Sequence, residues 1–482
     1  MKQNGIVYFI GAGPGDPELI TIKGLAILKQ ADVVLTDQLA HPSLLSVCKP
    51  DSTIIHVGKS KGKHSKTQAE INQQLLDFAK KEAIVVRLKG GDPFIFGRLG
   101  EEMEWLTSHG ITYSVIPGVS SAIAGPGYAG IPLTHRNLSR SVTFITGTTL
   151  QGTPIKDIPK TDTLVCLMGY HHLESIVTTL LQTNHLSPST PIALLSQTTT
   201  PNQQDLYSTL GNIVEDAKTT PLPTPILLVI GEVVHCAKTC EWFKKTALSQ
   251  RVILCRNTGD CNEWIQPLTT HGYDVVHAPV ITTEYNPNHQ LTPEIIKQSD
   301  IILFTSKNAV YFFMQALLSM SLDSRALHNK SIVSLTKPIG ETLKTLGLLA
   351  NYIATNPYQE TILTCIPENK LKNKTILYPK STLAMKTLDD IAQKKGAHVY
   401  HHDLYTTRLR SCDYLTIRSD DILVFFSPSA VESVFTQTSW PHPKTAIAIG
   451  KTTYKKLKST TQSPIKLLDS PTPQALIKLL NS

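Results

Sequence analysis

The chain has 482 residues, which is too long for one ordinary hydrophobic core, and we expect about two to four domains. Hydrophobic residues make up 41% and charged residues 17%, as in a soluble globular protein, and no apolar run approaches the roughly 18 to 20 residues that span a membrane. The net charge of +8 favours polyanionic partners, but the lysines are scattered, so a small acidic substrate fits as well as nucleic acid. The first residues lead directly into a predicted strand and leave no room for a signal peptide, and we expect a cytoplasmic protein.

The eight cysteines contain no C-x-x-C pair, which disfavours both a disulfide framework and a zinc knuckle. His235, Cys236 and Cys240 come closest to a metal cluster. Ordinary thiols in a reducing cytosol are the favoured interpretation, and we expect no metal.

A glycine-rich loop at residues 11–21 follows the predicted strand 6–10. Its three glycines allow a tight turn in which no Cβ keeps a ligand from the backbone. Apolar residues at helical spacing follow, so the unit reads as strand, loop and helix. The third glycine of the dinucleotide fingerprint is missing, and no Gly-Lys-Ser/Thr follows as in a P-loop. The loop predicts a cofactor site of unspecified kind.

Predicted strands alternate with helices throughout, which is typical of α/β domains with mostly parallel sheets. A segment of small residues at 116–132 indicates a hinge between two lobes, and a charged helix from Ala237 to Leu248 is expected to end the first half. The predicted strands are 6–10, 32–36, 53–57, 83–88, 112–116, 141–146, 163–168, 191–195 and 226–233, then 251–255, 274–280, 300–305, 331–335, 374–378, 397–405, 421–426 and 445–449.

Four further motifs follow the glycine loop at separate places. They are Val86–Arg98 with the sequence VRLKGGDPFIFGR, Pro117–Ala122 with PGVSSA, Tyr128–Arg136 with YAGIPLTHR, and Thr163–Gly169 with TLVCLMG. In this order and spacing, residues 4–240 resemble the S-adenosylmethionine-dependent uroporphyrinogen-III C-methyltransferases of the tetrapyrrole methylase superfamily.

The resemblance implies a set of cofactor contacts and two groups that move protons. Asp37 corresponds to a proton-accepting carboxylate and Lys59 to a proton donor, within a small basic stretch that could meet substrate carboxylates. The implied S-adenosylmethionine contacts are Pro14, Gly90, Gly91, Asp92, Ile95, Ser120, Ser121, Met168 and Thr198.

Taken singly, these residues have simpler interpretations. Asp92 would cap a turn, Ser120 and Ser121 would cap a helix, and Met168 would pack in the core. Asp37 would cap a helix start, and Lys59 would be a solvated loop charge. The sequence also departs from the family pattern at Leu99, Thr148, Leu167 and Thr198-Thr199.

In the second half, three strands lead into helices through small polar residues, at Thr305-Ser306, at Ser427 and at Gly450. Helix N-termini with free amides can bind carboxylates, although capping is the default role of such Ser and Thr side chains. Residues 250–482 resemble uroporphyrinogen-III synthase, which implies Tyr405 as the best catalytic candidate. A typical glycine-rich turn is missing at 335–338, and Lys380-Ser381 replaces the expected Arg/Gly.

The resemblances imply an α/β fold with two two-lobed domains. The expected methylase domain is 1–245, with lobes of about 1–117 and 118–245; the expected synthase domain is 250–482, with one lobe of about 250–283 and 407–482 and another of 284–406. The synthase would cyclise hydroxymethylbilane to uroporphyrinogen III with D-ring inversion, and the methylase would methylate it at C2 and C7 to precorrin-2, for sirohaem or cobalamin. By resemblance the methylase should form a homodimer, with tetrapyrroles as partners and neither nucleic acid nor a membrane.

Two alternatives stay open. One is another methylase of the superfamily, acting on later corrinoids, on a protein histidine or on ribosomal RNA. The other is a C-terminal half that only binds tetrapyrrole.

Overall fold

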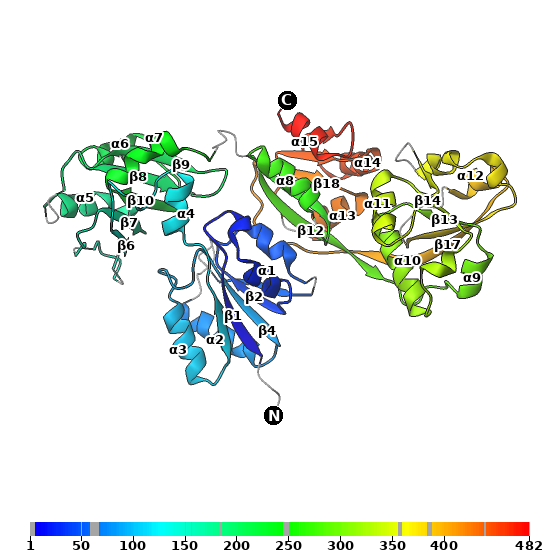
Figure 1. Cartoon of the computed structure of the whole chain (residues 1–482), viewed down its shortest axis with the longest axis horizontal. Helices are drawn as coiled ribbons and strands as arrows, with labels where there is room; N and C mark the ends of the chain where they lie inside the picture. The colour runs from blue at the N-terminus through cyan, green and yellow to red at the C-terminus, as the bar shows by residue number, and fades with distance from the viewer. Residues whose placement is uncertain are drawn as a thin grey trace. The chain divides into compact units, whose positions relative to one another are not determined.

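A computed structural model of the chain describes residues 5–49, 51–57, 67–149, 151–155, 157–182, 186–243, 250–259, 261–354, 359–382, 388–437 and 440–481. The chain forms two compact units, one of Met1–Pro279 with Cys412–Ser482 and the other of Val280–Ser411. Both are α/β with mostly parallel sheets, which confirms the expected fold class (Figure 1). The expected domain boundaries stay a prediction.

The first sheet has five parallel strands in the order β3-β2-β4-β1-β5. Each lies within about a residue of its predicted range. The strands are β1 (Ile6–Gly11), β2 (Val33–Thr36), β3 (Thr53–His56), β4 (Ile84–Lys89) and β5 (Tyr113–Ile116).

Alternation along β4 decides which helices cover which face of this sheet. Val86 packs with Leu28 of α1 (Ile22–Leu28), whereas Val85 packs with Leu75 of α2 (Gln68–Ala79) and Leu106 of α3 (Leu99–Ser108). Successive strand residues point to opposite faces, so Arg87 and Lys89 share the α2–α3 face with Val85. Figure 1 shows α1 on one side of β1, β2 and β4, and α2 with α3 on the other.

The second sheet is mixed, in the order β6-β7-β10-β8-β9. Only the β6–β7 pair is parallel. Helix α4 (Ser121–Tyr128) and α7 (Ala237–Cys240) pack on one face, and α5 (Leu173–Gln182) and α6 (Ile213–Thr219) on the other. The strands are β6 (Val142–Thr146), β7 (Thr163–Leu167), β8 (Pro191–Ser196), β9 (Gln204–Thr209) and β10 (Ile226–Ile230).

The helix expected over 237–248 ends at Cys240, so this prediction is wrong for residues 241–243. Glu241 is extended, and Trp242 and Phe243 are not helical; residues 244–249 lie outside the described parts. Trp242 Nε1 donates a hydrogen bond to the Gly127 carbonyl at 2.8 Å, and both aromatic rings lie within 5 Å of the Tyr128 ring. Aromatic packing on α4 therefore outweighs the helical spacing of this segment.

The remaining strands are hydrogen-bonded in the order β15-β14-β13-β16-β17-β12-β11-β18-β19-β20, with members in both units. In the first unit β11 (Arg251–Asn257), β18 (Ile422–Phe425), β19 (Thr445–Ala448) and β20 (Ile465–Leu467) are parallel neighbours. The helices there are α8 (Asn262–Thr270), α13 (Pro428–Gln437), α14 (Lys451–Thr460) and α15 (Pro473–Leu480).

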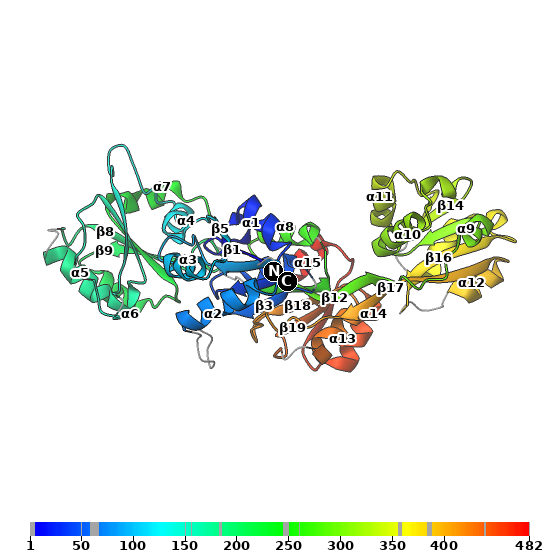
Figure 2. The same ribbon diagram turned by 90° about the horizontal axis from the view of Figure 1, so that it is seen from below.

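The second unit has β15 (Tyr352–Ile353), β14 (Ser331–Ser334), β13 (Ile301–Phe304) and β16 (Thr375–Ser381) as parallel neighbours. Figure 2 shows α10 and α11 on one side of these strands and α12 on the other. The helices are α9 (Pro293–Gln298), α10 (Lys307–Ser319), α11 (Lys337–Thr345) and α12 (Leu388–Lys394).

Two long strands exceed their predictions. β12 (Asp274–Tyr285) continues from the first unit into the second, where it pairs antiparallel with β17 (His398–Leu409). No helix in the described parts of the chain is both long and apolar enough to cross a membrane.

Candidate functional site

The loops that follow β1, β4 and β5 approach one another backbone to backbone at glycines. We call this contact of Gly11, Gly91 and Gly118 the glycine crossing. A Cβ added to Gly11 would lie 2.5 Å from Gly118 Cα, and one added to Gly118 would lie 2.4 Å from the Gly91 carbonyl oxygen. Gly91 N–H donates to Gly13 O at 2.7 Å, and Gly13 N–H donates back at 3.3 Å. Only glycine permits this approach of backbone to backbone. The glycine loop of the sequence is therefore one side of a crossing at the carboxyl edge, where open parallel sheets bind ligands.

The Asp92 carboxylate joins two of these loops. It accepts hydrogen bonds from Phe94 N–H at 2.8 Å and from Gly118 N–H at 2.9 Å. The simple interpretation of Asp92 as a turn cap is thus present in the structure. Beyond it, Phe94, Ile95 and Phe96 have exposed side chains and form an apolar rim.

The start of α4 lies beside this crossing. Ser120 is the N-cap, and its hydroxyl accepts a hydrogen bond from Ala122 N–H at 3.2 Å. A Cβ on Gly91 would be 3.9 Å from both Ser120 Cα and Ser121 N, in ordinary contact. The two serines therefore adjoin Gly91, although they come from a different motif.

Loops of the second sheet complete the surroundings of the glycine loop. A Cβ on Gly15 would meet the Thr198 carbonyl oxygen at 2.9 Å, and Asp16 N–H donates to Thr199 Oγ1 at 3.0 Å. Gly15 follows Pro14, which is half-buried, so Pro14 and Thr198 belong to touching loops. The half-buried Tyr128 donates to Asp16 Oδ2 at 2.9 Å; burial and the Asp16 charge raise the pKa of its hydroxyl.

Met168 stands apart from the core. Its side chain is 52% exposed at the end of β7, so core packing, its commonest role, does not apply here. Its backbone has φ of 56°, in the left-handed region. Residues in this region cluster at ligand sites when the surrounding structure holds them there. Among the described residues up to 243, positive φ also occurs at four other non-glycine residues, all in loops after β4 or β8: Phe96, Arg98, Gln197 and Thr199.

Asp37 follows β2 at the same edge of the sheet. Its N–H donates to Leu88 O at 3.1 Å, and a Cβ on Gly90 would lie 2.7 Å from Leu39 Cβ, so Asp37 adjoins the β4 loop. The carboxylate Oδ1 accepts from Arg87 Nη2 at 2.6 Å, with 29% of the side chain exposed. Asp37 is not the cap of the next helix, because His41 occupies that position.

A buried charge cluster lies behind Asp37, formed by Arg87, Lys89 and Glu102. Glu102 is fully buried on α3 and accepts from Arg87 Nε at 3.3 Å and from Lys89 Nζ at 3.0 Å and 3.1 Å. Burial and the charge of Arg87 lower the pKa of Lys89. Sequence reasoning assigned this cluster no role, although two cations inside an apolar strand were a usable signal.

Lys59 and the basic stretch around it fall within 58–66, outside the described residues. Their expected roles are therefore still predictions.

In the second unit, Tyr405 is buried on β17. Its hydroxyl is 2.9 Å from Ser306 Oγ, and its ring stacks on Phe312 at 5.1 Å between centroids. Burial raises the pKa of Tyr405. Ser306 also accepts from Ala309 N–H at 3.0 Å as the N-cap of α10, so the capping interpretation holds there.

The other two strand-to-helix turns of the second half differ in their caps. Ser427 Oγ accepts from Ala430 N–H at 3.1 Å, at the start of α13. Helix α14 begins after Gly450, which has no side chain to cap it.

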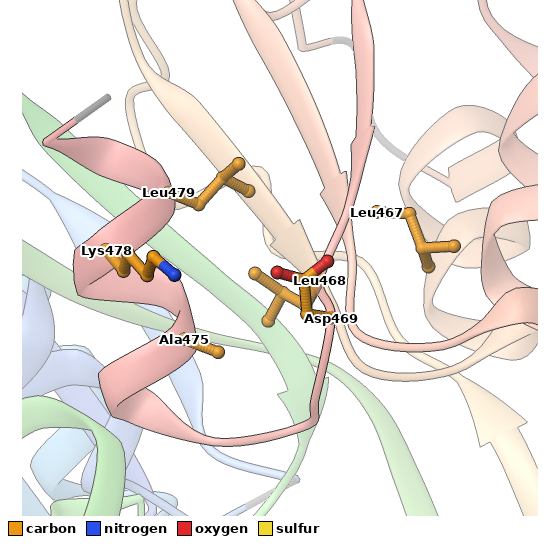
Figure 3. A pocket seen from close by; sticks show the side chains of 6 residues that line it. All are labelled: Leu467, Leu468, Asp469, Ala475, Lys478 and Leu479. Carbon is orange, nitrogen blue, oxygen red and sulfur yellow. The ribbon is translucent and has the colours of Figure 1, made fainter.

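Among the residues that the structure describes, no group of three or more His, Cys, Asp and Glu side chains could hold a metal ion. A small pocket of about 160 Å³ lies between β20 and α15 (Figure 3). Its lining is largely apolar, with one carboxylate and one ammonium, and we assign it no role. The lining residues are Leu467, Leu468, Asp469, Ala475, Lys478 and Leu479.

Sequence comparison identifies both halves. Residues 6–214 match the family of tetrapyrrole (corrin/porphyrin) methylases, and residues 262–478 match uroporphyrinogen-III synthase HemD. The chain is thus a tetrapyrrole methylase joined to a domain of the synthase family.

Two curated relatives indicate which kind of tetrapyrrole methylase this chain resembles. The uroporphyrinogen-III C-methyltransferase of Bacillus subtilis is 40% identical over 337 residues, covering 68% of this chain and 69% of that protein. The protein of the same name from Methanocaldococcus jannaschii is 51% identical over 237 residues, covering 48% of this chain and 98% of that protein. The chain belongs to the uroporphyrinogen-III C-methyltransferase family. It is an enzyme with a methyltransferase domain and a domain of the synthase (lyase) family.

Two further likenesses cover parts of the chain. The siroheme synthase of Psychrobacter cryohalolentis is 43% identical over 290 residues, and the match spans 59% of this chain and about half, 52%, of that protein. The uroporphyrin-III C-methyl transferase of Thermus thermophilus, solved with S-adenyl homocysteine, is 36% identical with a TM-score of 0.43, covering 48% of this chain and 99% of that one.

Proposed function

We propose that the methylase half transfers two methyl groups from S-adenosylmethionine to uroporphyrinogen III, at C2 and C7, to give precorrin-2. The observation that carries the proposal is Asp37: a partly exposed carboxylate, oriented by Arg87, beside the glycine crossing. Membership of the methyltransferase family supports the reaction class. The net charge of +8 suits a substrate with many carboxylates.

The residues around the crossing fit the methyl donor. Exposed Ile95 and Met168 supply apolar contact for an adenosine part. Asp92 and the Gly91 N–H are engaged within the protein, so we expect them to shape the cradle as well as to border the ligand. The proposed contacts are Pro14, Gly90, Gly91, Asp92, Ile95, Ser120, Ser121, Met168 and Thr198.

The chemistry asked of the chain's residues is modest. S-adenosylmethionine supplies a methyl group that is already strongly electrophilic. The protein therefore has to align a pyrrole α-carbon with that methyl group and to remove a proton from the alkylated ring system. We assign the proton acceptor to Asp37 and a proton donor to Lys59.

For the second half, we propose cyclisation of hydroxymethylbilane to uroporphyrinogen III with inversion of the D ring. Tyr405 is the candidate catalytic residue, and its burial keeps the hydroxyl protonated as a hydrogen-bond donor. The N-termini of α10, α13 and α14 are candidate sites for substrate carboxylates. The product would be the substrate of the methylase half, and we further propose that the methylase half forms a homodimer and that the enzyme works in the cytoplasm.

One experiment tests both halves. The full chain is given hydroxymethylbilane and methyl-labelled S-adenosylmethionine, and the product is analysed by mass spectrometry. Two labelled methyl groups on one tetrapyrrole are expected. Without the methyl donor, the product should be the type III isomer; the type I isomer alone would reject the synthase proposal and leave a binding module. Methylation of supplied uroporphyrinogen III would still test the first half.

A further inference from the structure

The charge cluster of Arg87, Lys89 and Glu102, on the α2–α3 face of the first sheet, is almost completely buried. Arg87 is 3% exposed, Lys89 is 3% exposed and Glu102 is fully buried. Charged groups are kept in such a place only when they are paired and hydrogen-bonded, because removing them from water is costly. Within the cluster, Glu102 is the shared anion between both cations.

Arg87 uses different edges of its guanidinium for its two carboxylates. Nε faces Glu102 at 3.3 Å, whereas Nη2 faces Asp37 at 2.6 Å, and Nη1 donates to the carbonyls of Leu35 and Leu88 at 3.4 Å and 3.3 Å. The planar group is thus fixed on three sides. Of its two carboxylate partners, only Asp37 is open to solvent, with 29% of its side chain exposed.

Glu102 is itself fixed from a second helix. Gln68, the first residue of α2, donates from Nε2 to Glu102 Oε1 at 3.1 Å. The same amide donates to Oδ1 of Asn72, one turn further along α2, at 2.9 Å. The orientation of Glu102 therefore depends on α2, on α3 and on β4 together. A chain of contacts leads from these elements through Arg87 to Asp37.

We propose that Arg87, held by Glu102, is the positioning residue of the methyl transfer reaction, and that it fixes the orientation of the Asp37 carboxylate. Arg87 is too buried to touch the tetrapyrrole, so it acts through Asp37. The inference rests on the proposed role of Asp37 as proton acceptor. Arg87 contacts Asp37 directly, and the charge of Lys89 also interacts with that of Asp37.

The test compares variants of the full chain with uroporphyrinogen III as substrate. Arg87→Met leaves Lys89 and Glu102 as a balanced buried pair, so the fold should persist. We expect kcat to fall by about tenfold or more, because the acceptor loses its orientation. KM for uroporphyrinogen III should stay within about twofold of wild type, because Arg87 is too buried to bind the substrate. The Kd of S-adenosylhomocysteine by calorimetry should stay within about twofold of wild type.

Three further variants separate the effect of position from that of charge. Arg87→Lys keeps the cation but lacks the planar fork that reaches both carboxylates, so kcat should stay below wild type. Glu104→Gln is the matched control for changes on α3, because this exposed glutamate lies on the same helix, and wild-type kinetics are expected. The double change Lys89→Met with Glu102→Gln removes one charge of each sign and should lower kcat with Arg87 intact.

The outcomes are separable. Wild-type kcat in Arg87→Met would overturn the inference, as would a fall in activity matched by lost cofactor affinity, which indicates a structural role. Should Arg87→Met fail to fold, Arg87→Lys decides, because unchanged kcat in that variant overturns the inference as well. Full activity of Asp37→Ala would instead reject the proposed function of Asp37 itself.

Discussion

The hydroxyl of Tyr128 donates a hydrogen bond to Asp16 Oδ2 at 2.9 Å. The two residues are 112 positions apart and join the glycine loop to α4. Thr199, which lies after the second sheet's strand β8, accepts from Asp16 N–H at 3.0 Å. Asp16 therefore holds the glycine loop against both neighbouring segments.

Replacing Tyr128 by Phe should loosen this attachment. We expect the free energy of unfolding to fall by about 1.5 to 3 kcal/mol, the usual cost of one hydrogen bond to a charged acceptor. Urea unfolding of the purified protein measures the change. Tyr170→Phe is the control, because its hydroxyl has no hydrogen bond among the described residues; an equal loss in both variants would contradict the prediction.

Asp37→Ala should retain the cofactor and lose methyl transfer. The residue is the proposed proton acceptor, and general base catalysis contributes about 10²- to 10⁴-fold to a rate. Labelled-methyl transfer gives the rate, and calorimetry with S-adenosylhomocysteine gives the affinity. Asp51→Ala, at an exposed position before β3, is the control. Abolished affinity in Asp37→Ala would make Asp37 a structural residue.

The glycine crossing predicts that Gly118→Ala is damaging. Its new Cβ would lie 2.4 Å from the Gly91 carbonyl oxygen and 2.7 Å from Gly11 Cα, both backbone atoms that have little freedom to move. We expect loss of cofactor binding and a melting temperature lower by several degrees, as for a destabilisation of about 1 to 3 kcal/mol.

Gly100→Ala is the matched control for that change. A Cβ there meets nothing within 4 Å, and the residue lies in α3, where alanine is the better helix former. Its melting temperature should be equal to wild type or higher. Normal cofactor affinity in Gly118→Ala would show that the crossing tolerates a methyl group.

The sequence predicted the parts of this fold that depend on local patterns. Apolar strands such as Ile301–Phe304 were found because burial on both faces leaves a continuous hydrophobic run. β9 was missed because Gln204–Thr209 is a polar edge strand that only its pairing with β8 defines. The helix expected after Ala237 was cut short by Trp242 and Phe243, whose packing on Tyr128 joins residues more than 100 positions apart.

In the candidate site, too, the sequence predicted the residues that belong to local motifs but not the contacts between distant segments. Motifs indicated Asp37 and the glycines, because turn chemistry is local. The link from Arg87 to Glu102 crosses from β4 to α3, and the contact of Asp16 with Tyr128 joins two lobes. Sequence spacing alone could not supply these partners, since only the tertiary fold brings them within hydrogen-bond distance.

The last prediction concerns Tyr405 in the synthase half. Tyr405→Phe removes the hydroxyl that contacts Ser306, yet Ser306 keeps its hydrogen bond from Ala309 N–H. We therefore expect a change in unfolding free energy of only about 0.5 to 1.5 kcal/mol. The synthase rate should fall by about tenfold or more, because the hydroxyl is the proposed catalytic hydrogen-bond donor. Chromatographic separation of type III from type I uroporphyrinogen, formed from hydroxymethylbilane by the full chain, measures the rate.

The pH dependence of stability gives an independent check on this tyrosine. Burial raises the folded-state pKa of Tyr405, so the folded protein keeps the proton where the unfolded chain loses it, above a pKa of about 10. Its contribution is fully present below that pH and is lost as pH rises further. Wild type should thus lose more stability than Tyr405→Phe between pH 9 and about 11 in urea titrations. Tyr311→Phe, at an exposed position on α10, should follow wild type, and identical curves for wild type and Tyr405→Phe would reject a buried, protonated Tyr405.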